Sequence, residues 1–228
     1  MLNPEQIQEA ALDIRYLLNR GYPRKVSLDL AGNRYQLTSD LRHLLHRGVF
    51  SDADSKSRSK RKIPIKGIRD KELAIDGYNV IITVEAGLSG QPLVLGDDGF
   101  IRDISGLSGR FKKTERTEEA IRMVLDVLRK VKPRHFLFLF DAPISRSGQL
   151  ARDIRDRLKR EGLPGEARAV KVPEKILNGF PGVVATSDTA IIDQSKRAVD
   201  LAGAILRQRT NLDSLFRLNK KRTPRVHL

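Results

Sequence analysis

The chain has 228 residues, of which 39% are hydrophobic and 31% are charged, and it contains no cysteine. The missing cysteine excludes disulfides, thiolate zinc sites, iron–sulfur clusters and cysteine nucleophiles. An excess of 43 Lys and Arg over 28 Asp and Glu gives a formal net charge of +15. Such a charge favours a polyanionic partner, nucleic acid before an anionic membrane surface. No apolar run is long enough to span a bilayer and the start does not resemble a signal peptide, so we expect a cytoplasmic protein without a membrane partner.

The first fifty residues, 1–50, predict a small basic α+β module in which two helices flank a hairpin. A capped helical pattern begins at Asn3 and ends at Gly21. Residues 26–30 then alternate apolar and polar side chains, which is typical of a strand and predicts the hairpin. A second helix is expected to end at Gly48.

The composition changes twice after this module. Residues 51–71 are polar and basic without hydrophobic periodicity, which predicts a linker. Strands alternate with helices over residues 72–208, the pattern of an α/β domain with a parallel sheet. Residues 209–228 form a basic tail.

Three of the predicted strands end in an aspartate at the transition to the next helix, namely Asp76, Asp141 and Asp188. One such residue alone is often a helix cap. In a parallel sheet, however, all three carboxylates converge on the same edge, where open α/β sheets bind ligands. Carboxylates that repel one another, with no histidine or cysteine nearby, require a cation, and oxygen ligands indicate Mg²⁺ or Mn²⁺.

Other polar residues join this constellation as candidates. Glu118 lies beside the apolar stripe of its predicted helix, where it either faces the sheet edge or serves as a favourable charge at the helix N-terminus. Ser145, Arg146 and Ser147 follow the second strand-end aspartate at a helix N-terminus, which suits a phosphate or ordinary capping. The basic residues that we expect to contact a nucleic-acid backbone are Arg110 and Arg146 and, in the N-terminal module, Arg24 and Lys25.

Several short motifs resemble a known nuclease family. Residues 75–80, Ile-Asp-Gly-Tyr-Asn-Val, resemble the opening motif of the NYN (YacP-like) branch of PIN-domain nucleases. Phe-Asp-Ala at 140–142 resembles the second acidic strand end of that branch, and Ala-Thr-Ser-Asp at 185–188 resembles its Thr-x-Asp motif. The segments 20–25 and 45–50 are similar to an uncharacterised prokaryotic domain that is found fused ahead of PIN-like domains.

The resemblance implies a PIN-like, Rossmannoid three-layer sandwich with a central, mainly parallel sheet, preceded by a small α+β domain. It also implies a metal-dependent ribonuclease. In such an enzyme Asp76, Glu118, Asp141 and Asp188 would bind the metal or hold metal-bound waters. Asn79 would orient Asp76 or a phosphate. The assignment of Asp193, which lies further into its helix, is left open.

Three other functions compete with the ribonuclease. A non-catalytic RNA- or ribosome-binding factor could keep the same fold without turnover. A phosphatase of the haloacid-dehalogenase type would need an aspartate two residues after the first, where Tyr78 stands, and no Gly-x-Gly-x-x-Gly motif of a dinucleotide-binding enzyme follows any strand. The sequence does not determine whether the substrate is RNA or DNA, how many metal ions bind, or whether the protein forms a homodimer.

Overall fold

Two sheets organise the part of the chain that the computed structural model describes, residues 4–104, 113–209 and 214–218. The strands of the main sheet are β1 (Glu72–Asp76), β4 (His135–Asp141), β5 (Gly165–Val170), β6 (Val183–Ala185) and β7 (Ala198–Val199). They pair in the order β5-β4-β1-β6-β7, and every pair is parallel. The strands of the small sheet are β2 (Leu93–Leu95), β3 (Ile101–Asp103) and β8 (Leu215–Arg217), in the order β3-β2-β8. The predicted parallel α/β domain is therefore confirmed.

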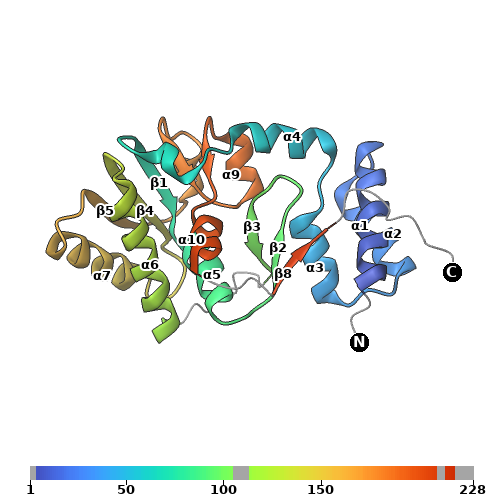
Figure 1. Ribbon diagram of the computed structural model, residues 1–228, viewed down its shortest axis with the longest axis horizontal. Helices are drawn as coiled ribbons and strands as arrows, with labels where there is room; N and C mark the ends of the chain where they lie inside the picture. Colours follow the sequence, from blue (N-terminus) through green and yellow to red (C-terminus); the bar gives the residue numbers. More distant parts are fainter. Residues whose placement is uncertain (1–3, 105–112, 210–213, 219–228) are drawn as a thin grey trace.

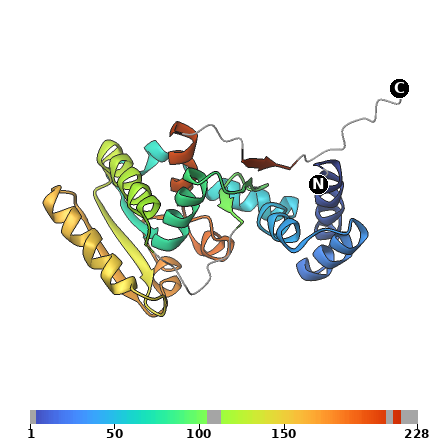
Figure 2. The same cartoon turned by 90° about the horizontal axis from the view of Figure 1, so that it is seen from below.

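Helices cover both faces of the main sheet because its strands are apolar on both faces. Ile75 and Phe138 belong to a core with α5 (Gly77–Leu88), α6 (Glu115–Val131), α7 (Ser147–Arg160) and α10 (Leu201–Arg209). Ala74, Leu139 and Val184 point to the other face and pack against α8 (Glu174–Leu177) and α9 (Thr189–Gln194). Figure 2 shows the long helices of the first layer side by side along the sheet. Within the described residues, no helix combines the length and apolar character needed to cross a membrane.

The strand order reverses direction at β1, and this reversal fixes where a site can form. From β1 the chain proceeds to β4 and β5 on one side, and then returns to β6 and β7 on the other. The switch point of the topology therefore lies between β1 and β6, which pair directly. Ligands of open α/β sheets bind at the carboxyl ends of the strands at such a point.

The N-terminal module consists of helices α1 (Pro4–Asn19), α2 (Arg24–Arg34) and α3 (Ser39–Gly48), so the predicted hairpin was wrong. Helix α2 occupies the segment expected to form a strand. Its buried positions include Ser27 and Ala31, which lie one turn apart, whereas Val26 and Leu30 are about half exposed. Packing of α2 against α1 through small side chains thus overrides the alternating pattern of larger ones.

Residues 51–71, for which the sequence predicts a basic linker, contain helix α4 (Asp52–Arg61) and the 3₁₀ helix η1 (Ile65–Ile68). Ser51 caps α4, because its hydroxyl accepts a hydrogen bond of 3.1 Å from the Asp54 N–H. The buried positions of α4 are Ser55 and Arg58 rather than apolar residues, which explains why no hydrophobic periodicity signals the helix. Arg58 forms a two-pronged ion pair with Asp193 of α9.

The small sheet attaches the N-terminal module to the main sheet and lies between them in Figure 1. Its strands β2 and β3 form an antiparallel hairpin, and the turn between them carries Asp97. Arg15 of α1 grips Asp97 with two hydrogen bonds of 2.9 Å, and both side chains are almost fully buried. The Phe50 N–H donates to the same carboxylate at 3.0 Å. Strand β8, within the predicted basic tail, completes the sheet beside β2.

Replacing Arg15 should test how strongly this contact holds the module. Arg15→Met leaves the buried Asp97 carboxylate without its ion-pair partner, so we expect the free energy of unfolding to fall by about 3 kcal/mol, measured by urea denaturation. The control is Arg34→Met on α2, whose side chain is 72% exposed and lies 3.8 Å from Asp13. Its loss should stay below about 0.5 kcal/mol. Equal losses for the two variants would contradict this account of docking.

Candidate functional site

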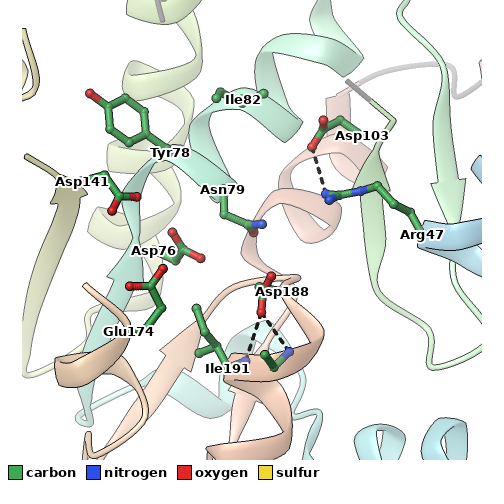
Figure 3. A pocket seen from close by; sticks show the side chains of 11 residues that line it. Arg47, Asp76, Tyr78, Asn79, Ile82, Asp103, Asp141, Glu174, Asp188 and Ile191 are labelled. Carbon is green, nitrogen blue, oxygen red and sulfur yellow. Dashed lines mark hydrogen bonds and ion pairs between the residues drawn. The ribbon is translucent and has the colours of Figure 1, made fainter. Parts of the chain in front are cut away.

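A pocket of about 360 Å³ opens at the carboxyl ends of β1, β4 and β6, at the switch point of the main sheet. Figure 3 shows its lining side chains converging from the sheet, its helices and the N-terminal module. The pocket is lined by Arg47, Asp76, Tyr78, Asn79, Ile82, Asp103, Asp141, Glu174, Asp188, Ala190 and Ile191. The three strand-end aspartates that the sequence singles out therefore line one pocket.

Asp76 is the last residue of β1 and the most strongly perturbed acid of the pocket. Burial, together with the negative charges of Asp188 and Asp141, raises its pKa to about 7. A hydrogen bond of 2.8 Å from the Thr186 hydroxyl works in the opposite direction because it stabilises the ionised form. Asp76 is consequently near the midpoint of its titration at neutral pH, and a nearby cation would favour its ionised form.

Two sets of hydrogen bonds join the turn after β1 to the turn after β6. The side-chain oxygen of Asn79 accepts from the Ser187 backbone N–H at 2.8 Å and from its hydroxyl at 3.0 Å. The Thr186 hydroxyl, which donates to Asp76, also accepts from the Asp188 N–H at 3.0 Å. Asn79 therefore positions the loop that carries Asp188. Its backbone N–H also hydrogen-bonds to the Asp76 carboxylate and works against the rise in the pKa of Asp76, in line with the predicted orientation of Asp76.

Asp188 combines a structural role with a place in the pocket. Its Oδ1 accepts hydrogen bonds from the Ala190 N–H at 2.9 Å and the Ile191 N–H at 3.1 Å, which caps α9 (Figure 3). Helix capping, one of the two interpretations of a strand-end aspartate, is thus correct for this oxygen. The other oxygen, Oδ2, has no hydrogen-bond partner among the described residues and remains accessible for a ligand.

The pocket contains two further acids and one cation that the sequence reasoning missed. Glu174 lies in the first turn of α8, and its negative charge adds to burial in raising the pKa of Asp141. Asp103, at the end of β3, accepts a hydrogen bond of 2.9 Å from the Thr83 hydroxyl. Arg47 reaches the pocket from α3. Glu174 follows a predicted strand and Pro173, a signal that could have identified it; Arg47 carries no local signal because only the docking of its helix brings it here.

Two predicted site acids lie outside the lining of the pocket. Glu118, on α6, is about half exposed and pairs with Lys113 at 2.5 Å. Asp193 pairs with Arg58 and holds α4 against α9. The α6 apolar stripe packs into the main core, while the Thr117 hydroxyl in the first turn of α6 donates to Glu85 of α5 at 3.0 Å.

The residues predicted to contact phosphate are spread over two regions. Ser145 and Arg146 are exposed in the loop between β4 and α7, close in sequence to Asp141. Ser147 is buried, and its hydroxyl donates to the Ala142 carbonyl oxygen at 3.2 Å, so it closes this loop. Arg110 lies outside the described residues.

Arg24 and Lys25 lie in a separate groove on the N-terminal module, of about 650 Å³. Its other lining residues are Leu28, Asp29, Ser39, Arg42, His43 and His46. The Arg24 guanidinium lies 4.8 Å from the centre of the Phe50 ring and donates to the His46 carbonyl oxygen. Burial lowers the pKa of Arg24 to about 10, and the positive charges of Arg58 and Arg102 contribute. We call this groove the basic groove.

The side chains of the pocket that could bind a metal ion are carboxylates, which offer the oxygen ligands that Mg²⁺ and Mn²⁺ prefer. Within the described ranges, no three acidic or histidine side chains are gathered so that they would hold an ion between them. Mg²⁺ in proteins is usually held by one or two carboxylates, with waters and substrate phosphates completing its shell. The pocket therefore fits a largely hydrated ion that Asp76 and one neighbouring carboxylate would hold.

Comparison with known proteins places the chain in a family. A family model described as a domain of unknown function, DUF5616, matches residues 65–204, and a model described as a protein of unknown function, DUF434, matches residues 6–61. An uncharacterized protein of Methanocaldococcus jannaschii is 36% identical over 197 residues, which cover 86% of this chain and 94% of that protein. No solved structure gives a significant match. Because the DUF5616 match covers more than half of its length, the chain belongs to the DUF5616 family.

Proposed function

We propose that the protein is a metal-dependent ribonuclease with a PIN-like fold, and that the pocket at the switch point holds Mg²⁺ or Mn²⁺ during phosphodiester hydrolysis. One observation carries the proposal: the carboxylates of three parallel strand ends, Asp76, Asp141 and Asp188, line a single pocket. They do so in a protein with a formal net charge of +15, which favours a polyanionic substrate. The motif resemblance at 75–80, 140–142 and 185–188 supports the same assignment.

Each carboxylate has a distinct task under this proposal. A bound ion would supply an acidic water and neutralise charge that develops on the scissile phosphate. Asp76, oriented by the Thr186 hydroxyl, would hold the ion together with Asp141 or with the open oxygen of Asp188. Glu174 and Asp141 make the same end of the pocket more negative, because Glu174 lies close enough to raise the pKa of Asp141. These acids also hold and release protons as the water reacts.

The basic groove supports the choice of a nucleic-acid substrate. Arg24, Lys25 and Arg42 line it together with two histidines, while Asp29 is its single acid among the lining residues. Cations of this kind bind backbone phosphates without regard to sequence. The same groove would serve a non-catalytic RNA-binding factor, so cleavage is what separates the two functions.

Conservative changes at two strand-end acids test the catalytic proposal. Asp76→Asn and Asp188→Asn remove a ligand charge, so RNA cleavage with Mn²⁺ should fall by about 100-fold or more, measured on labelled single-stranded and structured RNA. Asparagine remains a good helix cap, and Asp188→Asn therefore separates capping from metal binding. RNA affinity should change by less than about threefold, since binding rests on phosphate contacts elsewhere.

The matched control is Asp126→Asn on α6, which removes an acid that pairs with Arg129 outside the pocket. Its cleavage rate should equal that of the wild type. If all four proteins bind RNA and none cleaves it with Mn²⁺, the ribonuclease proposal fails and a non-catalytic RNA-binding function remains.

Substitutions at two glutamates test which of them belongs to the site. Glu174→Gln should lower the cleavage rate by about tenfold, because it removes a charge that lines the pocket. Glu118→Gln should change the rate by less than about twofold, because Glu118 pairs with Lys113 away from the pocket. The measurement is the initial rate of RNA cleavage at saturating Mn²⁺. The reverse ranking would restore Glu118 as the site glutamate.

The raised pKa of Asp76 predicts how stability depends on pH without metal. Asp76 binds a proton more tightly in the folded protein, with a pKa of about 7, than in the unfolded chain, where aspartate has a pKa of about 3.9. The folded state is therefore progressively penalised as pH rises from about 4 to 7. Because Asn stays neutral, Asp76→Asn should gain about 2–3 kcal/mol over the wild type between pH 5 and pH 8.

Chemical denaturation in EDTA at the two pH values measures this gain. Adding Mn²⁺ at pH 8 should stabilise the wild type more than Asp76→Asn, because a ligand that binds only the folded state stabilises it by mass action. A constant stability difference between the two proteins at both pH values would show that Asp76 titrates normally.

A further inference from the structure

Arg47 belongs to the N-terminal module but lines a pocket that is otherwise built from the α/β domain. It lies in the last turn of α3, and the docking of that helix against the small sheet carries it to Asp103 and Asp188. Figure 3 shows its guanidinium entering the pocket beside Asp103. Among the described residues that line the pocket, Arg47 is the single cation and five carry carboxylates.

The guanidinium of Arg47 is unusually poorly paired for a mostly buried arginine. Among the described residues, Arg47 forms an ion pair with Asp103, and 3.5 Å separates its Nη2 from Asp103 Oδ2. That oxygen already accepts a hydrogen bond of 2.9 Å from the Thr83 hydroxyl. Its Nε is buried without a hydrogen-bond partner among the described residues. A buried donor left without an acceptor costs free energy, so the present contacts of the guanidinium do not account for its placement. The Arg47 side chain is 25% exposed and lines the pocket, so a ligand there can reach it.

Other arginines that join the same parts of the chain are paired more completely. Arg15 of α1 holds Asp97 of the small sheet, and Arg58 of α4 holds Asp193 of α9, each with two hydrogen bonds of 2.7–2.9 Å. Those pairs explain how the elements are held together without a contribution from Arg47. Docking of the N-terminal module therefore does not account for the position of Arg47 in the pocket.

A phosphodiester approaching five carboxylates meets strong repulsion unless a cation accompanies it. The planar guanidinium fork matches two phosphate oxygens, and the pairing is strengthened by charge. We propose that Arg47 binds the phosphate of the RNA strand in the pocket, so that the N-terminal module supplies part of the substrate site. This inference rests on the proposed function for the identity of the strand.

The same turn of α3 also indicates where the strand continues. His46, the residue before Arg47, lines the basic groove together with Arg24 and Lys25. The last turn of α3 thus separates the acidic pocket from the basic groove. A strand held at Arg47 extends over this turn into the groove, where cations and apolar side chains face it.

RNA binding without turnover tests the role of Arg47. The experiment measures fluorescence anisotropy of a labelled single-stranded RNA of about 12 nucleotides on the full-length protein, with Asp76→Asn in every sample to block cleavage, over a series of salt concentrations. Arg47→Gln should weaken binding by about tenfold and reduce the salt slope by about one. Arg47→Lys should recover part of the loss, since it keeps the charge but not the fork.

Two further variants distinguish phosphate binding from a general effect of charge or stability. Arg34→Gln removes an exposed arginine from the same module and should change affinity by less than about twofold. Asp103→Asn leaves Arg47 without its ion-pair partner, so RNA affinity should rise; a loss of affinity there would mean that the pair supports the fold. Thermal melting confirms that each variant is folded, and Arg47→Lys carries the test if Arg47→Gln is not.

Equal RNA affinities for Arg47→Gln and Arg34→Gln would overturn the inference. The two proposals fail separately. Arg47-dependent binding in a protein that never cleaves RNA supports the inference and removes the ribonuclease. Cleavage that depends on Asp76 but is unchanged in Arg47→Gln supports the ribonuclease and removes the role of Arg47.

Discussion

The site depends on the hydrogen bonds that join the turns after β1 and β6. The Thr186 hydroxyl donates to Asp76, 110 residues away in sequence, and Ser187 donates to Asn79, 108 residues away. These bonds hold the two turns in one geometry. The same threonine accepts from the Asp188 N–H, which fixes the start of α9. The switch point of a parallel sheet offers the crevice; these short polar side chains determine which carboxylates face it.

Charge is distributed unevenly over the molecule, and the proposed function uses both parts. Acids gather at the strand ends, where burial raises the pKa of Asp76 and Asp141 and so disfavours their ionised forms. Cations gather in the N-terminal module, which the buried pair of Arg15 and Asp97 holds against the small sheet. A bound metal ion would neutralise the acids at the strand ends, and a nucleic-acid backbone would neutralise the cations of the N-terminal module. Arg47 is the point at which the two meet.

The sequence predicts the main sheet and its strand-end aspartates because both follow from local patterns. The buried run before Asp141 and the acid that ends it lie within a few residues of one another, so no tertiary information is needed. The segment 26–30 misled the prediction because its alternating apolar residues are largely exposed on a helix. Glu118 pairs with Lys113 and is absent from the lining of the pocket. Helical periodicity did not predict this, because it gives the face of a residue but not the contacts of that face. Arg47 could not be found at all, since a contact between distant parts of the chain places it.

A crystal structure of the protein grown with Mn²⁺ tests the central claim most directly. Anomalous scattering would locate the ion independently of any assay, and the account predicts a peak in the pocket, about 2.1 Å from an oxygen of Asp76 and with waters completing its shell. The neighbouring carboxylate of Asp141 or Asp188 should lie within reach of the ion or of its waters. Strong Mn²⁺ peaks elsewhere, with none in this pocket, would contradict the account.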